Sequence, residues 1–348
     1  MAVKNVRIGI VGAGENTRVR HIPGFRAISG VEIVGVVNST PKSSQRVAQE
    51  FSIPKTYPDW RACIADPDVD AVMIGTWPNL HCEVTCAALN AGKHVLTEAR
   101  MARNAAEARQ MLVAAQAHPE LAAQIVPSPF GLRHLDYVLQ MIHGSYLGEL
   151  REVVAISVDD MFWDYTQPLH WRQDADISGY NTLSLGIIHE ALLRWVPSPT
   201  RVYAQTSLFE PTRPVLGEQT PGKVTVPDSV QVLTQLENGA RGIYHVSGID
   251  LCGPGRHLHL YGSNGTIKLE FGETDRLFAG RRNMPLAEIV VEPEKLGGWR
   301  VEAEFIGAIR GEEQVRLTDF ETGVRYMEFT EAVIRSGQTG LAIDLPLK

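Results

Sequence analysis

An apolar segment that runs directly into a glycine-rich turn constrains the fold of this chain more than any other feature. Residues 6–11 read Val-Arg-Ile-Gly-Ile-Val, and Gly12-Ala13-Gly14 follow at once. A strand that ends in such a turn and continues into a helix brings backbone N–H groups and the positive end of a helix dipole to one point. Because that arrangement suits a pyrophosphate, the sequence predicts the first βαβ unit of a dinucleotide-binding domain.

The glycine pattern of this turn is incomplete. Gly12 and Gly14 occupy its first two positions, but Thr17 stands where a third glycine or alanine is usual. The position of the turn between a predicted strand and a predicted helix favours a cofactor site, with Glu15 and Asn16 as further contacts, over a tight turn that binds nothing.

Strand-like and helix-like segments alternate through the first 126 residues. This alternation predicts an α/β fold with a parallel, doubly wound sheet, which binds ligands at the carboxyl ends of its strands. The remaining strands are expected at residues 31–37, 71–76, 94–97 and 121–126.

The end of the second predicted strand bears on the choice of cofactor. Asn38 and Ser39 stand where an acidic residue would bind a ribose 2′-hydroxyl and repel a 2′-phosphate. Without a carboxylate, a 2′-phosphate meets no repulsion there, and Thr40, Lys42 and Arg46 can bind it. The sequence therefore predicts NAD or NADP and slightly favours NADP.

Composition limits the classes of protein. The 348 residues exceed the size of one ordinary core, so two domains are expected. The net charge of −7 argues against nucleic-acid binding. No apolar run approaches the length of a membrane span, and the first apolar run is already a strand, not a signal peptide. Four cysteines in so long a chain suggest reduced thiols and a cytoplasmic protein.

The second half of the chain predicts an antiparallel sheet. Short strands flank the turns at Asn238-Gly239 and Asn264-Gly265, which are typical of β-hairpins. An apolar helical segment that ends in Leu192-Leu193-Arg194-Trp195 precedes these strands.

Several motifs together resemble those of the glucose–fructose oxidoreductase and inositol dehydrogenase family, Gfo/Idh/MocA. The resemblance rests on residues 76–81 (Thr-Trp-Pro-Asn-Leu-His), 91–98 (Ala-Gly-Lys-His-Val-Leu-Thr-Glu), 147–150, 171–172 and 192–195. It implies an N-terminal Rossmann domain at residues 1–126. It also implies a substrate-binding and oligomerisation domain at 127–337 with a large, mainly antiparallel open sheet. The tail 338–348 is expected to pack on the first domain.

The resemblance also implies a nicotinamide cofactor, a carbohydrate-like substrate and a homodimer or homotetramer formed through the open sheet. Further cofactor contacts are expected at the matching motif positions. These are Thr76, Trp77, His81, Glu98 and Ala99.

Three positions depart from the family pattern. The usual Glu-Lys-Pro motif, whose lysine assists proton transfer, reads Glu98-Ala99-Arg100. In the second domain, Ser184 and Ile188 replace the aspartate and histidine of an Asp-x-Gly-x-His pattern. His189 follows one residue later, about 100° around a helix from the expected face.

The missing groups leave His189, Tyr180 and His170 as candidates for proton transfer. A histidine titrates near neutral pH, which suits this task, although His189 can equally be a core residue of an apolar helix. Arg100 stays protonated and can stabilise a negative charge but cannot act as a base. No metal site is expected. Candidate substrate contacts are Arg100, Trp171, Arg172, Asp176 and Asn181.

Three functions stay open at this point. The preferred one is an NAD(P)-dependent oxidoreductase that transfers hydride to or from a sugar, a polyol or a related cyclic alcohol or ketone. The second is an NAD-dependent glycoside-processing enzyme, in which transient oxidation permits elimination, hydrolysis or epimerisation without net redox change. The third is a non-catalytic NAD(P)-binding sensor. The many polar and aromatic residues before the second-domain helix argue for a ligand and against this third function.

Overall fold

The computed structural model describes residues 5–348, whose contacts divide into two compact units. Unit 1 runs to Pro127 and also includes Arg300–Val324. Unit 2 comprises Ser128–Trp299 and Arg325–Lys348.

Unit 1 contains a six-stranded parallel sheet in the order β3-β2-β1-β4-β5-β6. Side chains on both faces of β1 and β4 are buried, as expected for a parallel sheet between two layers of helices. The strands are β1 (Val6–Val11), β2 (Val31–Val37), β3 (Lys55–Thr56), β4 (Ala71–Ile74), β5 (His94–Thr97) and β6 (Ala123–Ile125).

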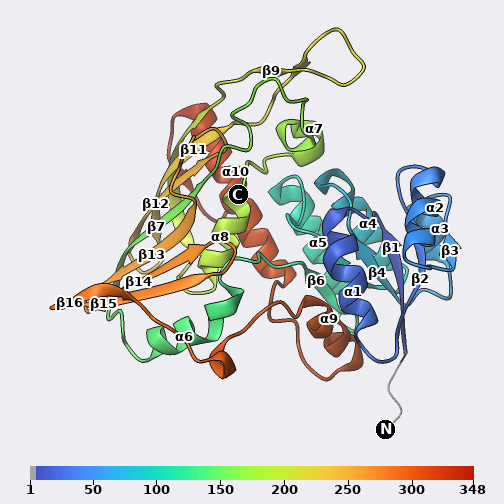
Figure 1. The fold of residues 1–348 in the computed structure, drawn as a ribbon, viewed down its shortest axis with the longest axis horizontal. Helices are drawn as coiled ribbons and strands as arrows, with labels where there is room; N and C mark the ends of the chain where they lie inside the picture. Colours follow the sequence, from blue (N-terminus) through green and yellow to red (C-terminus); the bar gives the residue numbers. More distant parts are fainter. Residues whose placement is uncertain (1–4) are drawn as a thin grey trace. The chain divides into compact units, whose positions relative to one another are not determined.

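The strand order reverses between β1 and β4, because β1 leads to β2 on one side while β4 pairs with its other side. Ligands of doubly wound sheets bind at the carboxyl ends of strands around such a reversal. The helices of this unit are the π-helix η1 (Thr17–His21), α1 (Ile22–Arg26), α2 (Pro41–Glu50), α3 (Trp60–Ala65), α4 (Pro78–Asn90), α5 (Ala105–Ala117) and α9 (Val301–Arg310) (Figure 1).

The predicted parallel α/β fold is confirmed. All five predicted strands form, and the sheet contains one more, β3, which has only two residues. A strand this short shows no periodicity in the sequence, so the pattern of apolar residues did not reveal it.

Unit 2 contains a nine-stranded mixed sheet in the order β16-β15-β14-β13-β7-β12-β11-β8-β17. The neighbours β7 and β12 are parallel, and the other neighbouring pairs are antiparallel. The strands are β7 (Leu150–Val158), β8 (Pro199–Ser207), β11 (Ser229–Leu236), β12 (Arg241–Ser247), β13 (Arg256–Gly262), β14 (Gly265–Phe271), β15 (Arg276–Arg281), β16 (Met284–Glu288) and β17 (Ile343–Asp344).

One face of this sheet is covered by helices. Along β11, alternate residues are buried and exposed, which gives the strand one apolar face. α8 (Leu185–Leu193) and most of α10 (Phe320–Thr339) lie along that face (Figure 1). Ser336 of α10 accepts a hydrogen bond from the Ala204 N–H of β8 at 2.9 Å, which ties the helix to the sheet.

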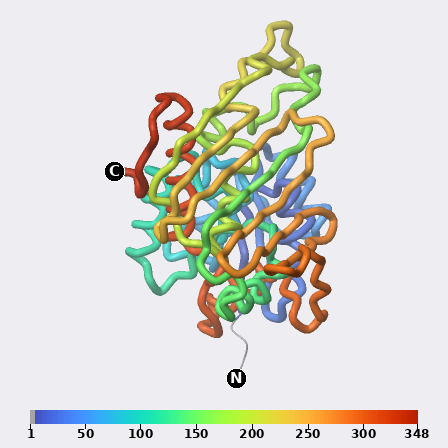
Figure 2. Tube along the Cα trace, turned by 90° about the vertical axis from the view of Figure 1, so that its left-hand side faces the viewer, coloured from blue at the N-terminus to red at the C-terminus, as the bar shows by residue number. Residues whose placement is uncertain are grey.

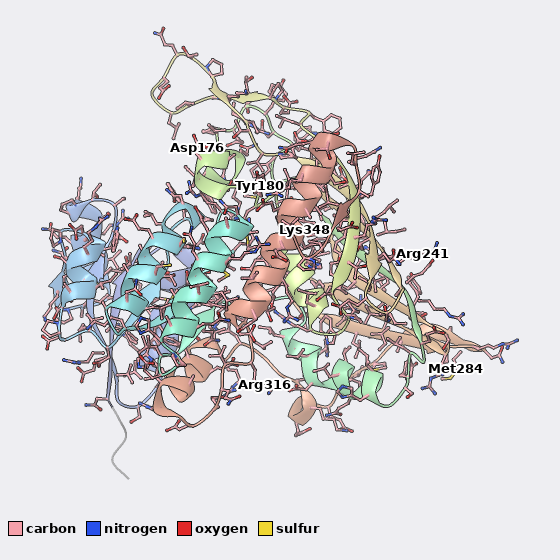
Figure 3. The ribbon with its side chains drawn as sticks, turned by 180° about the vertical axis from the view of Figure 1, so that it is seen from behind. Asp176, Tyr180, Arg241, Met284, Arg316 and Lys348 are labelled. Atoms are coloured by element: carbon pink, nitrogen blue, oxygen red, sulfur yellow. The ribbon has the colours of Figure 1, made fainter. Side chains whose placement is uncertain are left out.

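The opposite face of the sheet is open. Within the described part of unit 2, Tyr203, Leu233 and Ile243 expose 40%, 56% and 51% of their surface on this face. Figure 2 looks onto it, with the strands running side by side. Arg241 and Met284 are exposed on β12 and β16 and are labelled in Figure 3.

Shorter elements surround the sheet of unit 2. A two-stranded hairpin, β9 with β10, carries the buried Arg213, whose guanidinium donates to the backbone oxygens of Phe162 and Asp164 and fixes that loop. The elements are η2 (Leu132–His134), α6 (Leu135–His143), η3 (Trp171–Gln173), α7 (Ala175–Ser178), β9 (Thr212–Arg213), β10 (Gly222–Lys223) and η4 (Pro293–Lys295).

The structure differs from the predicted domains at two places. The tail 338–348 was expected on the first domain, but its β17 pairs with β8, because the edge of β8 offers free backbone groups. Arg201 of β8 also binds Asp344, with Nε 2.7 Å from Oδ1. Arg300–Val324 was expected in the second domain but belongs to unit 1, where α9 packs on α1. Residues 1–4 of the predicted first domain lie outside the described residues.

Over residues 5–348, none of the helices has both the length and the apolar character that a membrane span requires.

Candidate functional site

The glycine turn after β1 has a backbone that only glycine adopts readily. Gly12 has a φ of +86°, and its N–H donates to the Val37 oxygen of β2 at 2.8 Å. A Cβ atom at Gly12 would lie 2.7 Å from Thr76 Cγ2 and 2.8 Å from the Gly75 carbonyl carbon. Gly14 is exposed, and so is Glu15 at the start of the helix. The turn therefore leaves backbone room for a pyrophosphate at this helix N-terminus.

Gly75 supplies the space that the missing third glycine would have provided. Thr17 is buried against the end of β4, and a Cβ atom at Gly75 would lie 2.1 Å from Thr17 Oγ1 and 2.3 Å from the Gly12 oxygen. The usual third glycine permits close packing of helix and strand. Here the glycine is on the strand side, so the larger Thr17 fits.

Asn38 stabilises the glycine turn from the end of β2. Its Oδ1 accepts a hydrogen bond from the Ala13 N–H at 2.7 Å, and its own N–H donates to Ser44 Oγ at 2.9 Å. Thr40 caps α2 and exchanges hydrogen bonds with Ser43. The exposed groups at this end of β2 are Ser39, Lys42 and Arg46.

His81 connects the ends of β4 and β5. It is fully buried in α4, with Nε2 3.0 Å from the Thr76 oxygen and Nδ1 2.9 Å from the Arg100 oxygen. Burial lowers the pKa of its imidazole. Trp77 directly follows Thr76, whose backbone oxygen His81 contacts, and it exposes 51% of its surface. His81 thus holds the loops at the carboxyl edge of the sheet, where Arg100 is also buried.

Glu98, directly after β5, belongs to a buried charged cluster. His21 Nε2 lies 3.1 Å from Glu98 Oε1, and His21 Nδ1 lies 2.5 Å from Glu302 Oε1 of α9. Asn16 Nδ2 donates to the same Glu98 oxygen at 2.5 Å. A Cβ atom at Gly24 would lie 2.7 Å from Glu302 Cδ, so this glycine makes room for the carboxylate.

The two carboxylates keep the buried His21 protonated. Burial alone lowers the pKa of His21, but the hydrogen bonds to Glu302 and Glu98 outweigh it and raise the pKa to about 9. Burial likewise raises the pKa of Glu98, and His21 outweighs that effect, so the pKa of Glu98 is lowered. Both ring nitrogens face a carboxylate oxygen, and only an imidazolium can donate to both.

No sequence motif predicts this cluster. Asn16 and Glu98 were predicted as cofactor contacts, but His21 and Glu302 were not predicted. His21 and Glu302 are 281 positions apart, so no motif spacing connects them.

His189 lies in the core of unit 2. Its Nδ1 is 2.8 Å from the Tyr244 hydroxyl of β12, and its ring stacks on Phe329 of α10 with 3.6 Å between centroids. Burial, followed by the charge of Arg325, lowers the pKa of His189 to about 3. This is the environment of a core histidine, which argues against a role in proton transfer.

The substituted positions on α8 are also structural. Ser184 Oγ lies 2.6 Å from Ser157 Oγ of β7, and Ile188 is buried. The positions that carry an aspartate and a histidine in the family pattern are therefore occupied here by a serine bound to β7 and by a buried apolar residue.

The other second-domain candidates lie together on η3, α7 and the turn after them. His170 Nδ1 accepts from the Arg172 N–H at 3.2 Å, and the Arg172 guanidinium carbon lies 4.3 Å from the centre of the Trp171 ring. Burial, followed by the charge of Arg172, lowers the pKa of His170. Asp176 is exposed and Tyr180 half-buried (Figure 3).

Asn181 follows directly and is fully buried, with its Nδ2 donating to the Ser178 oxygen at 2.7 Å. This segment thus gathers six of the predicted residues, namely His170, Trp171, Arg172, Asp176, Tyr180 and Asn181. No group of three or more metal-binding side chains occurs within residues 5–348.

Comparison with known proteins identifies the family. Residues 6–124 match the model of an oxidoreductase family with an NAD-binding Rossmann fold, and residues 136–268 match the GFO/IDH/MocA C-terminal domain. The chain therefore belongs to the GFO/IDH/MocA family and is an oxidoreductase with an NAD-binding domain.

Individual relatives extend this result over the whole chain. The chain is 27% identical to 1,5-anhydro-D-fructose reductase from Ensifer adhaerens, over 97% of this chain and 98% of that protein. It is 25% identical to levoglucosan dehydrogenase from Pseudarthrobacter phenanthrenivorans, over 79% of this chain and 76% of that protein. The solved structure of a levoglucosan dehydrogenase in complex with NADH and L-sorbose has the same fold as this chain, with a TM-score of 0.87 and 22% identity. The match covers 98% of this chain and 99% of that chain.

We expect the His21 cluster to make stability depend on pH. The pKa of His21 is about 9 in the folded protein, against an ordinary value of 6.5. Its stabilising contribution is therefore complete below pH 6.5 and is lost as the pH rises through about 9. The contribution is at most about 3.5 kcal/mol, from about 1.4 kcal/mol for each pKa unit.

Urea unfolding at pH 6.5 and pH 9.5 measures this effect. The free energy of unfolding should fall more steeply with pH for the wild type than for His21→Gln, which serves as the matched control for all other titrating groups. Parallel pH dependences of the two proteins would contradict a protonated His21.

Proposed function

We propose that this oxidoreductase transfers hydride between a nicotinamide cofactor and a hydroxyl or carbonyl carbon of a sugar, an anhydrosugar or a polyol. The observation that carries this proposal is the glycine turn at Gly12, where a Cβ atom would collide with Thr76, together with the match of both domains to one oxidoreductase family. The names of the two relatives, which act on anhydrofructose and levoglucosan, support the substrate class.

The residues at the carboxyl edge of the unit 1 sheet fit such a cofactor. The backbone at Gly12 and Gly14 and the helix start at Glu15 and Asn16 suit the pyrophosphate. Asn38 and Ser39 suit the adenine ribose. Residues at the ends of β4 and β5 suit the nicotinamide end, and these are Thr76, Trp77, His81, Glu98 and Ala99. When bound, the nicotinamide supplies the hydride chemistry.

Each unit, taken by itself, contains groups that suit a substrate. In unit 1, Arg100 is buried directly after Ala99 and offers a positive charge to an oxygen that becomes negative. In unit 2, the segment of η3 and α7 offers aromatic faces and hydrogen-bonding groups for hydroxyls. The groups proposed there are His170, Trp171, Arg172, Asp176, Tyr180 and Asn181.

The test of the reaction begins with the nucleotide released from the purified protein, identified by mass and absorbance. The protein is then incubated with anhydrosugars, sugars and polyols while NAD(P)H is followed at 340 nm. We expect NAD(P)H to appear with at least one alcohol and to be consumed with the matching ketone. Product without any net change in NAD(P)H would indicate the glycoside-processing reaction instead, and binding of nucleotide without any product would indicate a sensor.

The choice between NAD and NADP is tested at Asn38. Ser39, Lys42 and Arg46 are exposed at this end of β2, and the side chain of Asn38 carries no charge. We propose that this site accepts NADP. Asn38→Asp keeps the acceptor for the Ala13 N–H but adds a negative charge near a 2′-phosphate. It should raise the Kd for NADP relative to NAD about tenfold, as expected for about 1.4 kcal/mol of repulsion. An unchanged ratio of the two Kd values, measured by fluorescence titration, would exclude this site for the 2′-phosphate.

We propose that two copies of the chain associate through the open face of the unit 2 sheet. This face carries Tyr203, Leu233 and Ile243 around a shallow hollow of about 380 Å³. Exposed apolar side chains gathered on one face are typical of an interface between subunits. The double variant Leu233→Glu with Ile243→Glu should therefore be monomeric in size-exclusion chromatography with light scattering. Val113→Glu, at an equally exposed apolar residue of α5, is the control and should keep the wild-type mass.

A further inference from the structure

The proposed reaction requires a group that exchanges a proton with the substrate hydroxyl, and the family lysine is absent. Ala99 carries no proton, and Arg100 remains protonated at all working pH values. His189, the histidine nearest to the family position in unit 2, is in the core against Tyr244 and Phe329. The side chain next to Ala99 on the other side is Glu98.

Exposure within the Glu98 cluster is graded. The side chain of Glu98 exposes 15% of its surface, that of Glu302 exposes 5% and that of His21 none. Glu98 is thus the member of the cluster that solvent or a ligand reaches. It follows β5 directly at the carboxyl edge of the sheet, and its N–H donates to the Ile74 oxygen of β4 at 2.9 Å.

The two carboxylate oxygens of Glu98 are used differently. Oε1 accepts from Asn16 Nδ2 at 2.5 Å and from His21 Nε2 at 3.1 Å, so two donors converge on it. Oε2 accepts from the Ala99 N–H at 3.2 Å. A carboxylate oxygen accepts two hydrogen bonds, so Oε2 retains capacity for a hydroxyl.

We propose that Glu98 exchanges the proton of the substrate hydroxyl through Oε2, and that His21 and Glu302 are positioning residues that hold its Oε1 and keep a second proton in reserve. This proposal rests on the proposed function. It assigns to the cluster the task that the lysine performs in the family pattern.

The protons and electrons balance as follows. In oxidation of an alcohol, the C–H bond breaks and its electron pair leaves as a hydride, which a bound nicotinamide would accept. The O–H bond breaks, the proton binds Glu98 Oε2, and a C=O bond forms. In reduction, the carbonyl carbon takes up the hydride and forms the C–H bond, while the ionised Glu98 receives the proton of His21 and passes a proton to the substrate oxygen. His21 then remains neutral until solvent restores its proton.

Charged groups from every neighbouring element enter this balance. Glu98, at the end of β5, and Glu302, in α9, both face the ring of His21. Asn16, just before the helix that carries His21, donates to Glu98. Glu98 also interacts electrostatically with His81 of α4. With His21 protonated and both carboxylates ionised, the three charged members of the cluster carry a net charge of −1, so a proton taken up from the substrate neutralises it.

The first experiment compares Glu98→Gln with wild-type protein in both directions of the reaction. Loss of a proton-transfer group should lower kcat about 100-fold or more. The Kd for the cofactor, measured alongside, should change by a much smaller factor than kcat. Glu120→Gln, at an exposed carboxylate of unit 1, is the control and should keep the wild-type kcat. A Glu98→Gln variant that folds and keeps more than a third of the wild-type kcat would overturn the proposal.

A second variant keeps Glu98 and changes only its support. In Glu302→Gln, His21 loses one of its two carboxylates and should release its proton at a lower pH. The alkaline limb of the kcat profile for ketone reduction, expected near pH 9 in the wild type, should then shift to lower pH by about one unit or more. An alkaline limb at the same pH in both proteins would overturn the role of His21 and Glu302.

A spectroscopic measurement separates this proposal from the proposed function. In cofactor-free protein with ¹⁵N-labelled histidine, the ring of His21 should carry two protons at pH 7.5 and titrate near pH 9, and Glu98→Gln should lower that midpoint. A neutral ring at pH 7.5 overturns the inference whatever the enzyme does. If the wild type transfers no hydride to any compound tested although His21 titrates as expected, the proposed function fails, and the proton role fails with it.

Discussion

Three distant segments of unit 1 meet at the buried imidazolium of His21. The helix after the glycine turn carries this residue, the end of β5 supplies Glu98, and the first turn of α9 supplies Glu302. A charge buried without a partner is strongly destabilising, so the imidazolium of His21 depends on the carboxylates that accept its hydrogen bonds. The arrangement of the glycine turn beside the end of β5 therefore depends on an ion cluster, and Gly24 leaves the space in which it forms.

The two buried histidines show how strongly partners decide the chemistry of a side chain. His21 and His189 are both inaccessible to solvent. Burial lowers the pKa of each, yet the pKa of His21 is raised to about 9 and that of His189 is lowered to about 3. The difference arises because His21 lies between two carboxylates, whereas His189 lies against Tyr244 and Phe329. Only His21 carries a second ring proton, and with it a positive charge, at neutral pH.

The departures from the family pattern affect packing at α8 and charge at the end of β5. On α8, Ser184 binds Ser157, and Ile188 is buried, so this helix serves packing. At the end of β5, Ala99 removes a charge that would otherwise stand beside Glu98. With no cation at position 99, the charge of His21 balances the carboxylate from inside the domain.

The sequence by itself determined the order of strands and helices in unit 1, the glycine turn and the family, because each depends on local periodicity or on short motifs. It also predicted Asn16 and Glu98 as cofactor contacts, and the structure places both in the His21 cluster. The two-residue β3 is too short to show a period, and the tail joined the second sheet because β8 offers a free edge. Only the tertiary structure decided that Gly75 compensates for Thr17 and that Glu302 meets His21. These contacts join residues far apart in the chain, and their energies depend on burial and distance, which no local pattern contains.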